Sequence, residues 1–170
     1  DSFNQVIYTD GSCCNNGKLN SYGGIGVFIN TDDHHNISEP LLIDHPTNQK
    51  AELVAIQKAI ELSTESNVLI VTDSKYSLNC LTLWHKKWIK DNWKLKNGNE
   101  IKNIDLIKNT LNLLQHKKNN GILITMHHLS DYGLYSHCGE PLSPIKKQIW
   151  FGNQQADKLS KIGSNKQFTP

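Results

Sequence analysis

Apolar residues follow two different periods along the first half of the chain. Strand-like runs at residues 5–10, 22–30 and 37–43 are separated by short polar turns, which is typical of an antiparallel meander. Glycines in the second run allow another backbone to approach closely. Residues 48–63 then place apolar side chains at helical spacing, and residues 68–73 are almost all apolar, as in a strand buried on both faces.

The second half predicts three more helices and one more strand. We expect helices over 74–83, 101–117 and 153–161 and a strand over 122–129. An irregular segment rich in glycine and proline, about 130–152, precedes the last helix, and loops of this length are usually functional or mobile. The order of elements predicts an α/β fold with a five-stranded mixed sheet, three antiparallel strands and then parallel ones, flanked by helices.

Length and composition predict the number of domains and the cellular compartment. The chain has 170 residues, of which 37% are hydrophobic, so we expect one globular domain over 1–170. No apolar stretch approaches the roughly 20 residues of a membrane span, and the start has no signal-peptide pattern. Four cysteines, two of them adjacent and none in a CxxC pair, disfavour zinc and disulfides and favour a reducing compartment, intracellular in the cytoplasm or nucleus.

The net charge of +2 hides a strongly basic segment. Between Trp84 and Lys118 the chain has nine lysines against three acidic residues, which indicates a polyanion partner unless the lysines only solvate a helix face. Within about 84–102, tryptophans alternate with lysines, a pattern that can stack on sugars while ammonium groups meet phosphates. Alternatively, Trp84 and Trp88 lie four residues apart and hold this segment together.

Four carboxylates stand where packing rarely requires an acid. Asp10 and Asp73 end strand-like runs, Glu52 lies in the first turn of its helix, and Asp157 lies at the start of the last helix. A cluster of acids repels itself unless cations lie between them, and oxygen ligands suit Mg²⁺ or Mn²⁺. The pattern therefore predicts two-metal phosphoryl chemistry, although Glu52 and Asp157 could each merely favour a helix N-terminus.

The local sequences around these acids carry a family resemblance. The motifs YTDGSC, TNQKAEL, TDS and GNQQADKL occur in this order at 8–13, 47–53, 72–74 and 152–159. Together they resemble the four acidic signatures of type 1 ribonuclease H, with TNQKAEL closest to eukaryotic-type wording, and the likeness covers essentially the whole chain. The segment 84–102 resembles the basic protrusion, or handle, of that family, which retroviral domains often lack.

The resemblance implies a fold and a reaction. It implies a ribonuclease H-like fold that hydrolyses the RNA strand of an RNA–DNA hybrid, leaving 3′-hydroxyl and 5′-phosphate ends. It also implies two Mg²⁺ ions, with Mn²⁺ as an alternative. By the same resemblance, Asp10 bridges both ions, Glu52 and Asp73 hold the ion on the leaving-group side, and Asp157 holds the ion on the nucleophile side.

The family also places a histidine on a loop near the acids, for product release or proton transfer. The text Ser136-His137-Cys138-Gly139 resembles the family's GHxG, so we assign this role to His137. The loop is longer here than in the family, and His127 and His128 are the alternatives, although an alternating strand favours packing or surface roles for them.

Ten further residues are expected to bind the substrate. Asn16, Asn48 and Gln49 match positions at the minor groove of the hybrid, where amides can meet a 2′-hydroxyl. Thr47 and Asn103 match a pocket for a DNA phosphate. Turn or capping roles are the alternatives for Asn16, Asn48 and Asn103. The handle contributes Trp84, Lys86, Lys87, Trp88 and Lys90.

Two rival readings remain at this point. One is a hybrid-binding domain without catalysis, which four intact acids disfavour. The other is the ribonuclease H domain of a reverse transcriptase. We expect a monomer, and because position 1 is Asp rather than Met, the full-length chain could carry a hybrid-binding module or a reverse transcriptase. The handle favours a self-standing enzyme.

Overall fold

The computed structural model describes residues 2–168, so residues 1, 169 and 170 of the expected domain lie outside the described part. One five-stranded sheet with the order β3-β2-β1-β4-β5 forms its centre. β1 pairs with β2, and β2 with β3, in antiparallel fashion, whereas β4 lies parallel to both β1 and β5. The predicted mixed sheet is confirmed. Its strands are β1 Gln5–Cys14, β2 Tyr22–Phe28, β3 Ile37–Pro40, β4 Asn67–Thr72 and β5 Leu123–His128.

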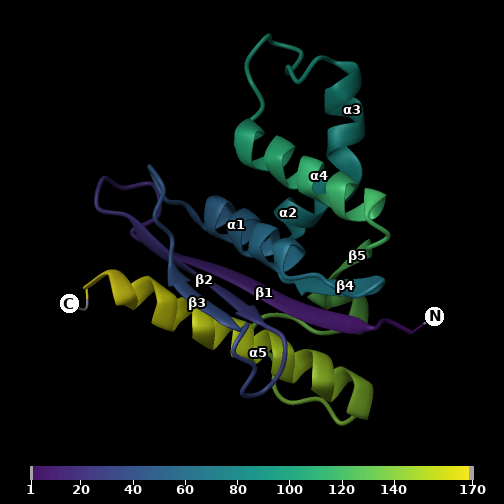
Figure 1. Ribbon diagram of the computed structural model, residues 1–170. Coiled ribbons are helices and arrows are strands. Elements are labelled where there is room, and N and C mark those ends of the chain that lie inside the picture. The colour runs from purple at the N-terminus through teal and green to yellow at the C-terminus, as the bar shows by residue number, and fades with distance from the viewer. Residues whose placement is uncertain (1, 169–170) are drawn as a thin grey trace.

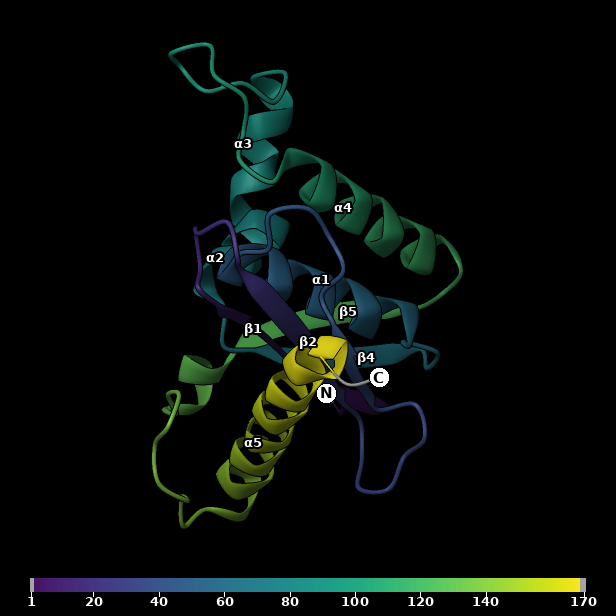
Figure 2. The ribbon, with the colours of Figure 1, turned by 90° about the vertical axis from the view of Figure 1, so that its left-hand side faces the viewer.

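Helices cover both faces of this sheet (Figure 1). The helices α1 and α4 lie on one face and α5 crosses the other. A continuous helical segment, made of α2, the π-helical turn η1 and α3, leads away from the sheet into a protrusion (Figure 2). Within residues 2–168, no helix is at once long and hydrophobic enough to cross a bilayer. The helices are α1 Asn48–Glu61, α2 Lys75–Asn79, η1 Cys80–Trp84, α3 His85–Lys90, α4 Ile104–Asn119 and α5 Pro144–Asn165, with 3₁₀ turns η2 Leu129–Tyr132 and η3 Lys166–Phe168.

The period of two in the strands divides the core between the two faces. Ile7 and Ile70 pack with the side chains of α1, whereas their neighbours Tyr8 and Val71 pack with those of α5. Because successive side chains of a strand point to opposite faces, a central strand covered on both faces must be apolar throughout. This explains the nearly continuous apolar run of β4.

The glycines of β2 bring α5 unusually close to the sheet. A Cβ atom at Gly24 would lie 2.2 Å from the carbonyl oxygen of Ser160, and one at Gly26 would lie 2.2 Å from that of Ala156. The backbone of α5 therefore packs directly on the backbone of β2, as the glycine pattern predicts.

Several predicted boundaries are wrong. β1 continues past Asp10 to Cys14, so this acid lies within a strand and does not end it. α5 begins at Pro144, not at residue 153, because Pro suits the first helical turn. Residues 144–152 of the predicted loop are therefore helical, and Gly152 packs above the ring of Tyr8, where a Cβ atom would lie 2.3 Å from a ring carbon. The helix predicted over 74–83 continues through α3 to Lys90.

Candidate active site

The four predicted acids converge on one cavity. Asp10 from β1, Glu52 from α1, Asp73 after β4 and Asp157 from α5 all line a hollow of about 390 Å³. Carboxylate oxygens of the first three lie within 4.8 Å of one another. The fourth carboxylate is paired instead with Lys161, whose Nζ lies 3.0 Å from Asp157 Oδ2. Segments far apart in the sequence thus build one acidic centre.

Glu52 is held against β1 by a glycine. Gly11 donates its backbone N–H to Glu52 Oε1 at 2.5 Å. A Cβ atom at Gly11 would lie 2.3 Å from the backbone carbon of Ala51, so only glycine lets β1 and α1 approach this closely. The helix α1 begins at Asn48, and its first turn contains no acidic residue. Glu52 therefore lies in the second turn, and the prediction of a first-turn position is wrong. Stabilisation of the helix N-terminus, which acts within the first turn, does not explain this buried acid.

Burial and mutual repulsion oppose the ionisation of two of the acids. Burial, with the nearby charge of Asp73 adding to it, raises the pKa of Asp10 to about 8. Burial and then the charges of Asp10 and Asp73 raise the pKa of Glu52 well above its ordinary value. The buried oxygen Glu52 Oε2 has no hydrogen-bond partner in the described part of the chain. An all-oxygen donor set with an unpaired buried oxygen fits a divalent cation such as Mg²⁺.

Asp157 lies well inside α5, so its predicted position at the start of the last helix is wrong. The helix N-terminus therefore does not account for this acid. Asp73, as predicted, directly follows the buried strand β4. Ser136 donates its hydroxyl to Asp73 Oδ2 at 3.0 Å, and His128 Nε2 lies 3.0 Å from the backbone oxygen of Asp73.

His137 shares a cavity with two of the acids. It lines a small hollow together with Asp73 and Asp157. His127 instead hydrogen-bonds Tyr132 through Nδ1 at 2.9 Å. The geometry favours His137 over His127 and leaves His128 as a support for the backbone at Asp73.

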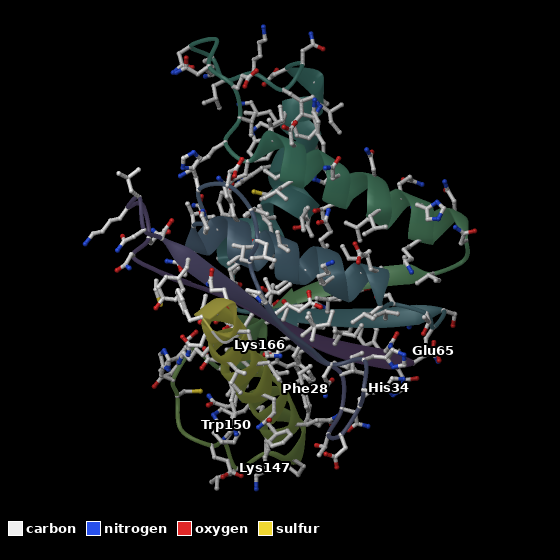
Figure 3. The ribbon with its side chains drawn as sticks, turned by 60° about the vertical axis from the view of Figure 1, so that its left-hand side comes forward. Phe28, His34, Glu65, Lys147, Trp150 and Lys166 are labelled. Carbon is white, nitrogen blue, oxygen red and sulfur yellow. The ribbon has the colours of Figure 1, made fainter. Side chains whose placement is uncertain are left out.

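Contacts to α5 anchor the loop on the C-terminal side of His137. Trp150 Nε1 donates to the backbone oxygen of Cys138 at 2.9 Å, and Lys147 Nζ lies 3.4 Å from Glu140. Both Trp150 and Lys147 project from the first half of α5 (Figure 3). His137 itself has a φ of 67°, a left-handed conformation that is uncommon for a residue other than glycine. The loop thus presents this exposed histidine at a defined place.

The predicted minor-groove residues lie beside the acids. Asn48 and Gln49 line the same cavity as the carboxylates. Asn16 lies in the turn after β1 and accepts a hydrogen bond from the backbone N–H of Asn48 at 3.0 Å. The cap of α1 is Thr47, whose Oγ1 accepts from the N–H of Lys50 at 3.1 Å, so Asn48 is not the cap. The hydroxyl proton of Thr47 can still serve a ligand.

Asn103 occupies the N-cap position of α4 without capping it. Its side chain makes no capping hydrogen bond, and its φ of 59° is left-handed. Its Nδ2 donates to Tyr76 Oη at 3.0 Å and reaches Gln49 Oε1 at 3.4 Å. The side chain therefore faces α2 and the start of α1 and makes no capping hydrogen bond, so the capping alternative is wrong.

The handle projects away from the sheet as α3 and the turn that follows it (Figures 1 and 2). Trp84 is 39% exposed, whereas Trp88 and Trp93 are half-buried, with ring centroids 6.1 Å apart. Lys108 Nζ lies 4.9 Å from the ring centre of Trp93. Trp88 and Trp93 thus hold the protrusion together. Exposed on α3 are Lys86, Lys87 and Lys90.

One lysine of the basic segment has a structural task. Lys117 Nζ donates to the backbone oxygens of Glu61 at 3.2 Å and Ser63 at 2.8 Å. A lysine there satisfies carbonyls at the C-terminal end of α1. Fewer lysines are therefore available to bind a polyanion than the count of nine in the sequence suggests.

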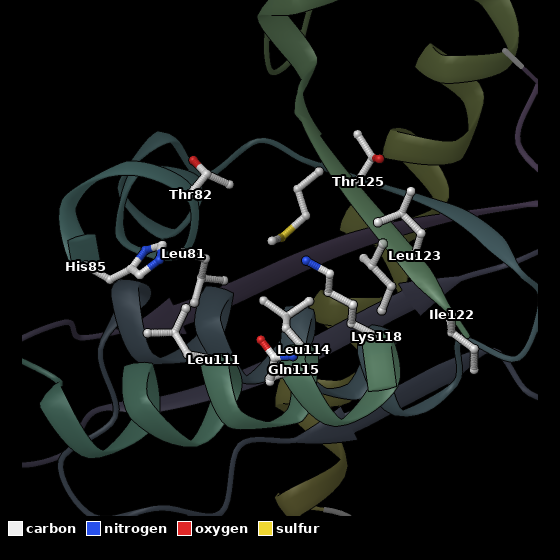
Figure 4. A pocket seen from close by; sticks show the side chains of 12 residues that line it. Leu81, Thr82, His85, Leu111, Leu114, Gln115, Lys118, Ile122, Leu123 and Thr125 are labelled. Atoms are coloured by element: carbon white, nitrogen blue, oxygen red, sulfur yellow. The ribbon is translucent and has the colours of Figure 1, made fainter. Parts of the chain in front are cut away.

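A larger hollow of about 450 Å³ lies between η1, α4 and β5 (Figure 4). Its lining is mainly apolar, with Leu81, Leu111 and Leu114 among the side chains, and includes no carboxylate. It therefore offers no carboxylate ligand for a hard cation.

Two hydroxyl groups near the acids escaped the prediction from sequence. Ser136 Oγ donates to Asp73 Oδ2 at 3.0 Å, and Ser160 Oγ donates to Asp10 Oδ2 at 2.8 Å. Ser160 stands three residues after Asp157, a spacing that puts both on one helix face and could have flagged it.

Comparisons with known proteins agree with this geometry. The RNase H family model matches residues 3–165. The chain is 38% identical over 161 residues to Ribonuclease H of Schizosaccharomyces pombe, covering 95% of this chain and 53% of that protein. It is 33% identical to Ribonuclease HI of Haemophilus ducreyi, and the match covers 94% of this chain and 89% of that protein. The chain thus spans about half of the first relative and most of the second.

Solved structures show the same similarity. The foamy viral protease-reverse transcriptase in complex with dsDNA matches with a TM-score of 0.68 and 28% identity, covering 96% of each chain. The same viral protein in complex with RNA/DNA hybrid matches with a TM-score of 0.65 and 26% identity, covering 96% of this chain and 20% of that one.

Proposed function

Because this chain belongs to the ribonuclease H family, we propose that it is an endonuclease that hydrolyses the RNA strand of RNA–DNA hybrids. The observation that carries the proposal is the convergence of Asp10, Glu52, Asp73 and Asp157 on one cavity, with a buried oxygen of Glu52 left without a partner in residues 2–168. A binding domain without catalysis has no need to keep four repelling acids together.

The acids would hold two Mg²⁺ ions, with Mn²⁺ as an alternative. Asp10 would contact both ions, Glu52 and Asp73 the one on the leaving-group side, and Asp157 the one on the nucleophile side. Such a pair supplies activation of water and stabilisation of the leaving oxygen. The expected products carry 3′-hydroxyl and 5′-phosphate ends. Lys161, which pairs with Asp157, would have to release it for metal binding.

Polar side chains around the acids would read the shape of the hybrid. The amides of Asn16, Asn48 and Gln49 can both donate to and accept from a 2′-hydroxyl, the group that distinguishes RNA from DNA. Thr47 and Asn103 would bind a phosphate of the DNA strand. This recognition needs no base identity, so we propose that cleavage depends on strand type and not on sequence.

A gel assay tests the proposal directly. Labelled RNA in an RNA–DNA hybrid is compared with the same RNA in an RNA duplex, each with and without Mg²⁺. We expect cleavage of the hybrid only when the ion is present. Equal cleavage of both duplexes, or hybrid cleavage in excess chelator, would contradict the proposal.

His137→Ala is expected to slow turnover without abolishing Mn²⁺-supported cleavage. A positioned acid–base group contributes about 10²-fold or more, so kcat should fall by roughly that factor while KM changes little. Steady-state kinetics on a hybrid measure both constants. His127→Ala is the control, because His127 hydrogen-bonds Tyr132. If kcat falls in His127→Ala and stays unchanged in His137→Ala, the catalytic role belongs to His127 and our assignment is wrong.

Replacing Lys86, Lys87 and Lys90 together with Ala is expected to raise KM and flatten its dependence on salt. Each lysine that meets a phosphate contributes close to one unit to the slope of log K against log salt. Replacement of the same three residues with Arg keeps the charge and is the matched control. An unchanged KM and slope in the Ala variant would remove the handle from substrate binding.

The similarity to the foamy viral protein favours a second setting for the same reaction. In that setting the chain would be the ribonuclease H domain of a reverse transcriptase and would act beside a polymerase. Sequencing of the full-length transcript separates this setting from a self-standing enzyme or one that carries a hybrid-binding module.

A further inference from the structure

A buried serine links the central acid to the last helix. Ser160 of α5 has no exposed surface. Its Oγ lies 2.8 Å from Asp10 Oδ2 and 2.8 Å from the backbone oxygen of Asp157. The hydroxyl has a single proton, and an ionised carboxylate is a stronger acceptor than a carbonyl, so Asp10 takes this hydrogen bond when it ionises to bind a metal ion. The backbone oxygen of Ser160 in turn accepts from Ser12 Oγ at 3.3 Å.

Close backbone packing fixes the position of this hydroxyl. A Cβ atom at Gly24 would lie 2.2 Å from Ser160 O, and one at Gly26 would lie 2.5 Å from Ser160 N. The backbone of Ser160 is therefore clamped against β2. Lys161, by contrast, is 60% exposed and can swing away from Asp157.

The chemical character of the donor suits a cation site. The charged residues that line the cavity with Asp10 are all acids, which repel its charge. The terminal torsion of an aspartate is broad, so repulsion alone would not select one orientation of the carboxylate. A neutral hydroxyl can fix Oδ2 without adding a positive charge that would compete with a bound ion.

We propose that Ser160 is a positioning residue that fixes the carboxylate of Asp10 in the orientation in which it receives divalent ions. The inference rests on the proposed function, since it assumes that Asp10 is a metal ligand. One turn of α5 then has two tasks, because it presents Asp157 to the cavity and orients Asp10 from behind.

Calorimetric titration of Mg²⁺ and Mn²⁺ into the substrate-free protein tests this role. Removal of a group that orients a metal ligand typically costs 10-fold to 100-fold in metal affinity, and we expect about 10-fold or more for Ser160→Ala. The Mg²⁺ concentration for half-maximal hybrid cleavage should rise in parallel, while KM for the hybrid stays within about twofold. Ser160→Cys keeps a weak donor, so its metal affinity should lie between that of the wild type and that of Ser160→Ala.

Ser164→Ala is the matched control. Ser164 is buried on the same helix and donates its hydroxyl to the backbone oxygen of Lys161 at 2.7 Å, away from the acids. A purely structural role of Ser160 would lower the melting temperature of both variants and leave metal affinity unchanged. Wild-type affinity in Ser160→Ala overturns the inference alone. Failure of the wild-type protein to bind either ion contradicts the proposed function and the inference with it.

Discussion

Asp10→Asn is expected to remove about three orders of magnitude of hybrid cleavage and, without metal, to stabilise the fold at neutral pH. A bound ion supplies several kcal/mol to the transition state, and each 1.4 kcal/mol is about tenfold in rate. Asp10 is the acid at the centre of the cluster, so its loss affects both proposed ions. Binding of the hybrid, which depends on other residues, should remain measurable. Cleavage at the wild-type rate would refute the metal assignment.

The gain in stability follows from the sign of the pKa shift. The pKa of Asp10 is raised from 3.8 to about 8 in the folded protein, mainly by burial. Between these values the folded state binds more protons than the unfolded state, so the free energy of unfolding decreases as pH rises. The amide that replaces the carboxyl group does not titrate, and the advantage of Asp10→Asn should therefore grow from pH 5 to pH 8.

Thermal unfolding in excess chelator measures this advantage. A gain of 1 kcal/mol raises the melting temperature of a domain this size by about 2–4 °C. Added Mg²⁺ should stabilise the wild-type protein, since it binds only the folded state, and should have little effect on Asp10→Asn. Asp44→Asn, at an exposed position, is the control. A wild type that is the more stable of the two at pH 8 in chelator would contradict this account.

Gly11→Ala is expected to cost about 1–3 kcal/mol of stability and to reduce cleavage roughly 10²-fold. The added methyl would lie 2.3 Å from the backbone of Ala51, so β1 and α1 must separate. Glu52, which accepts the N–H of Gly11, would then move relative to Asp10. A misplacement of about 1 Å in a catalytic group can cost 10²-fold in rate.

Denaturant unfolding and steady-state kinetics measure the two effects of Gly11→Ala separately. Kinetics are measured at a temperature at which circular dichroism shows the variant to be folded. Gly139→Ala is the control, because a Cβ atom there meets nothing within 4 Å. Normal activity in a folded Gly11→Ala would show that this contact does not set the position of Glu52.

The sequence predicts the elements with unambiguous periods and misjudges those that depend on distant contacts. The apolar run of β4 identifies a buried strand and places Asp73 at its end. The start of α5 is missed because Pro144 and Gly152 resemble loop residues. Their helical role becomes apparent only when Gly152 lies against the ring of Tyr8, far away in the sequence.

The acids are predictable and their supports are not. Asp10, Glu52, Asp73 and Asp157 stand in motifs, so their residue types and local elements identify them. The hydroxyl of Ser160 and the hydroxyl of Ser136 act through contacts across 150 and 63 residues of chain. The spacing from Asp157 puts Ser160 on the same helix face, but no local pattern shows which distant side chain a serine will contact.

The order of the four acids along the chain has a consequence for biosynthesis. Asp10 and Glu52 are synthesised before Asp157 and the helix that carries it. A nascent polypeptide therefore holds an incomplete set of ligands until α5 docks on β2. The proposed nuclease activity would therefore begin only after α5 has been synthesised and has docked on the sheet.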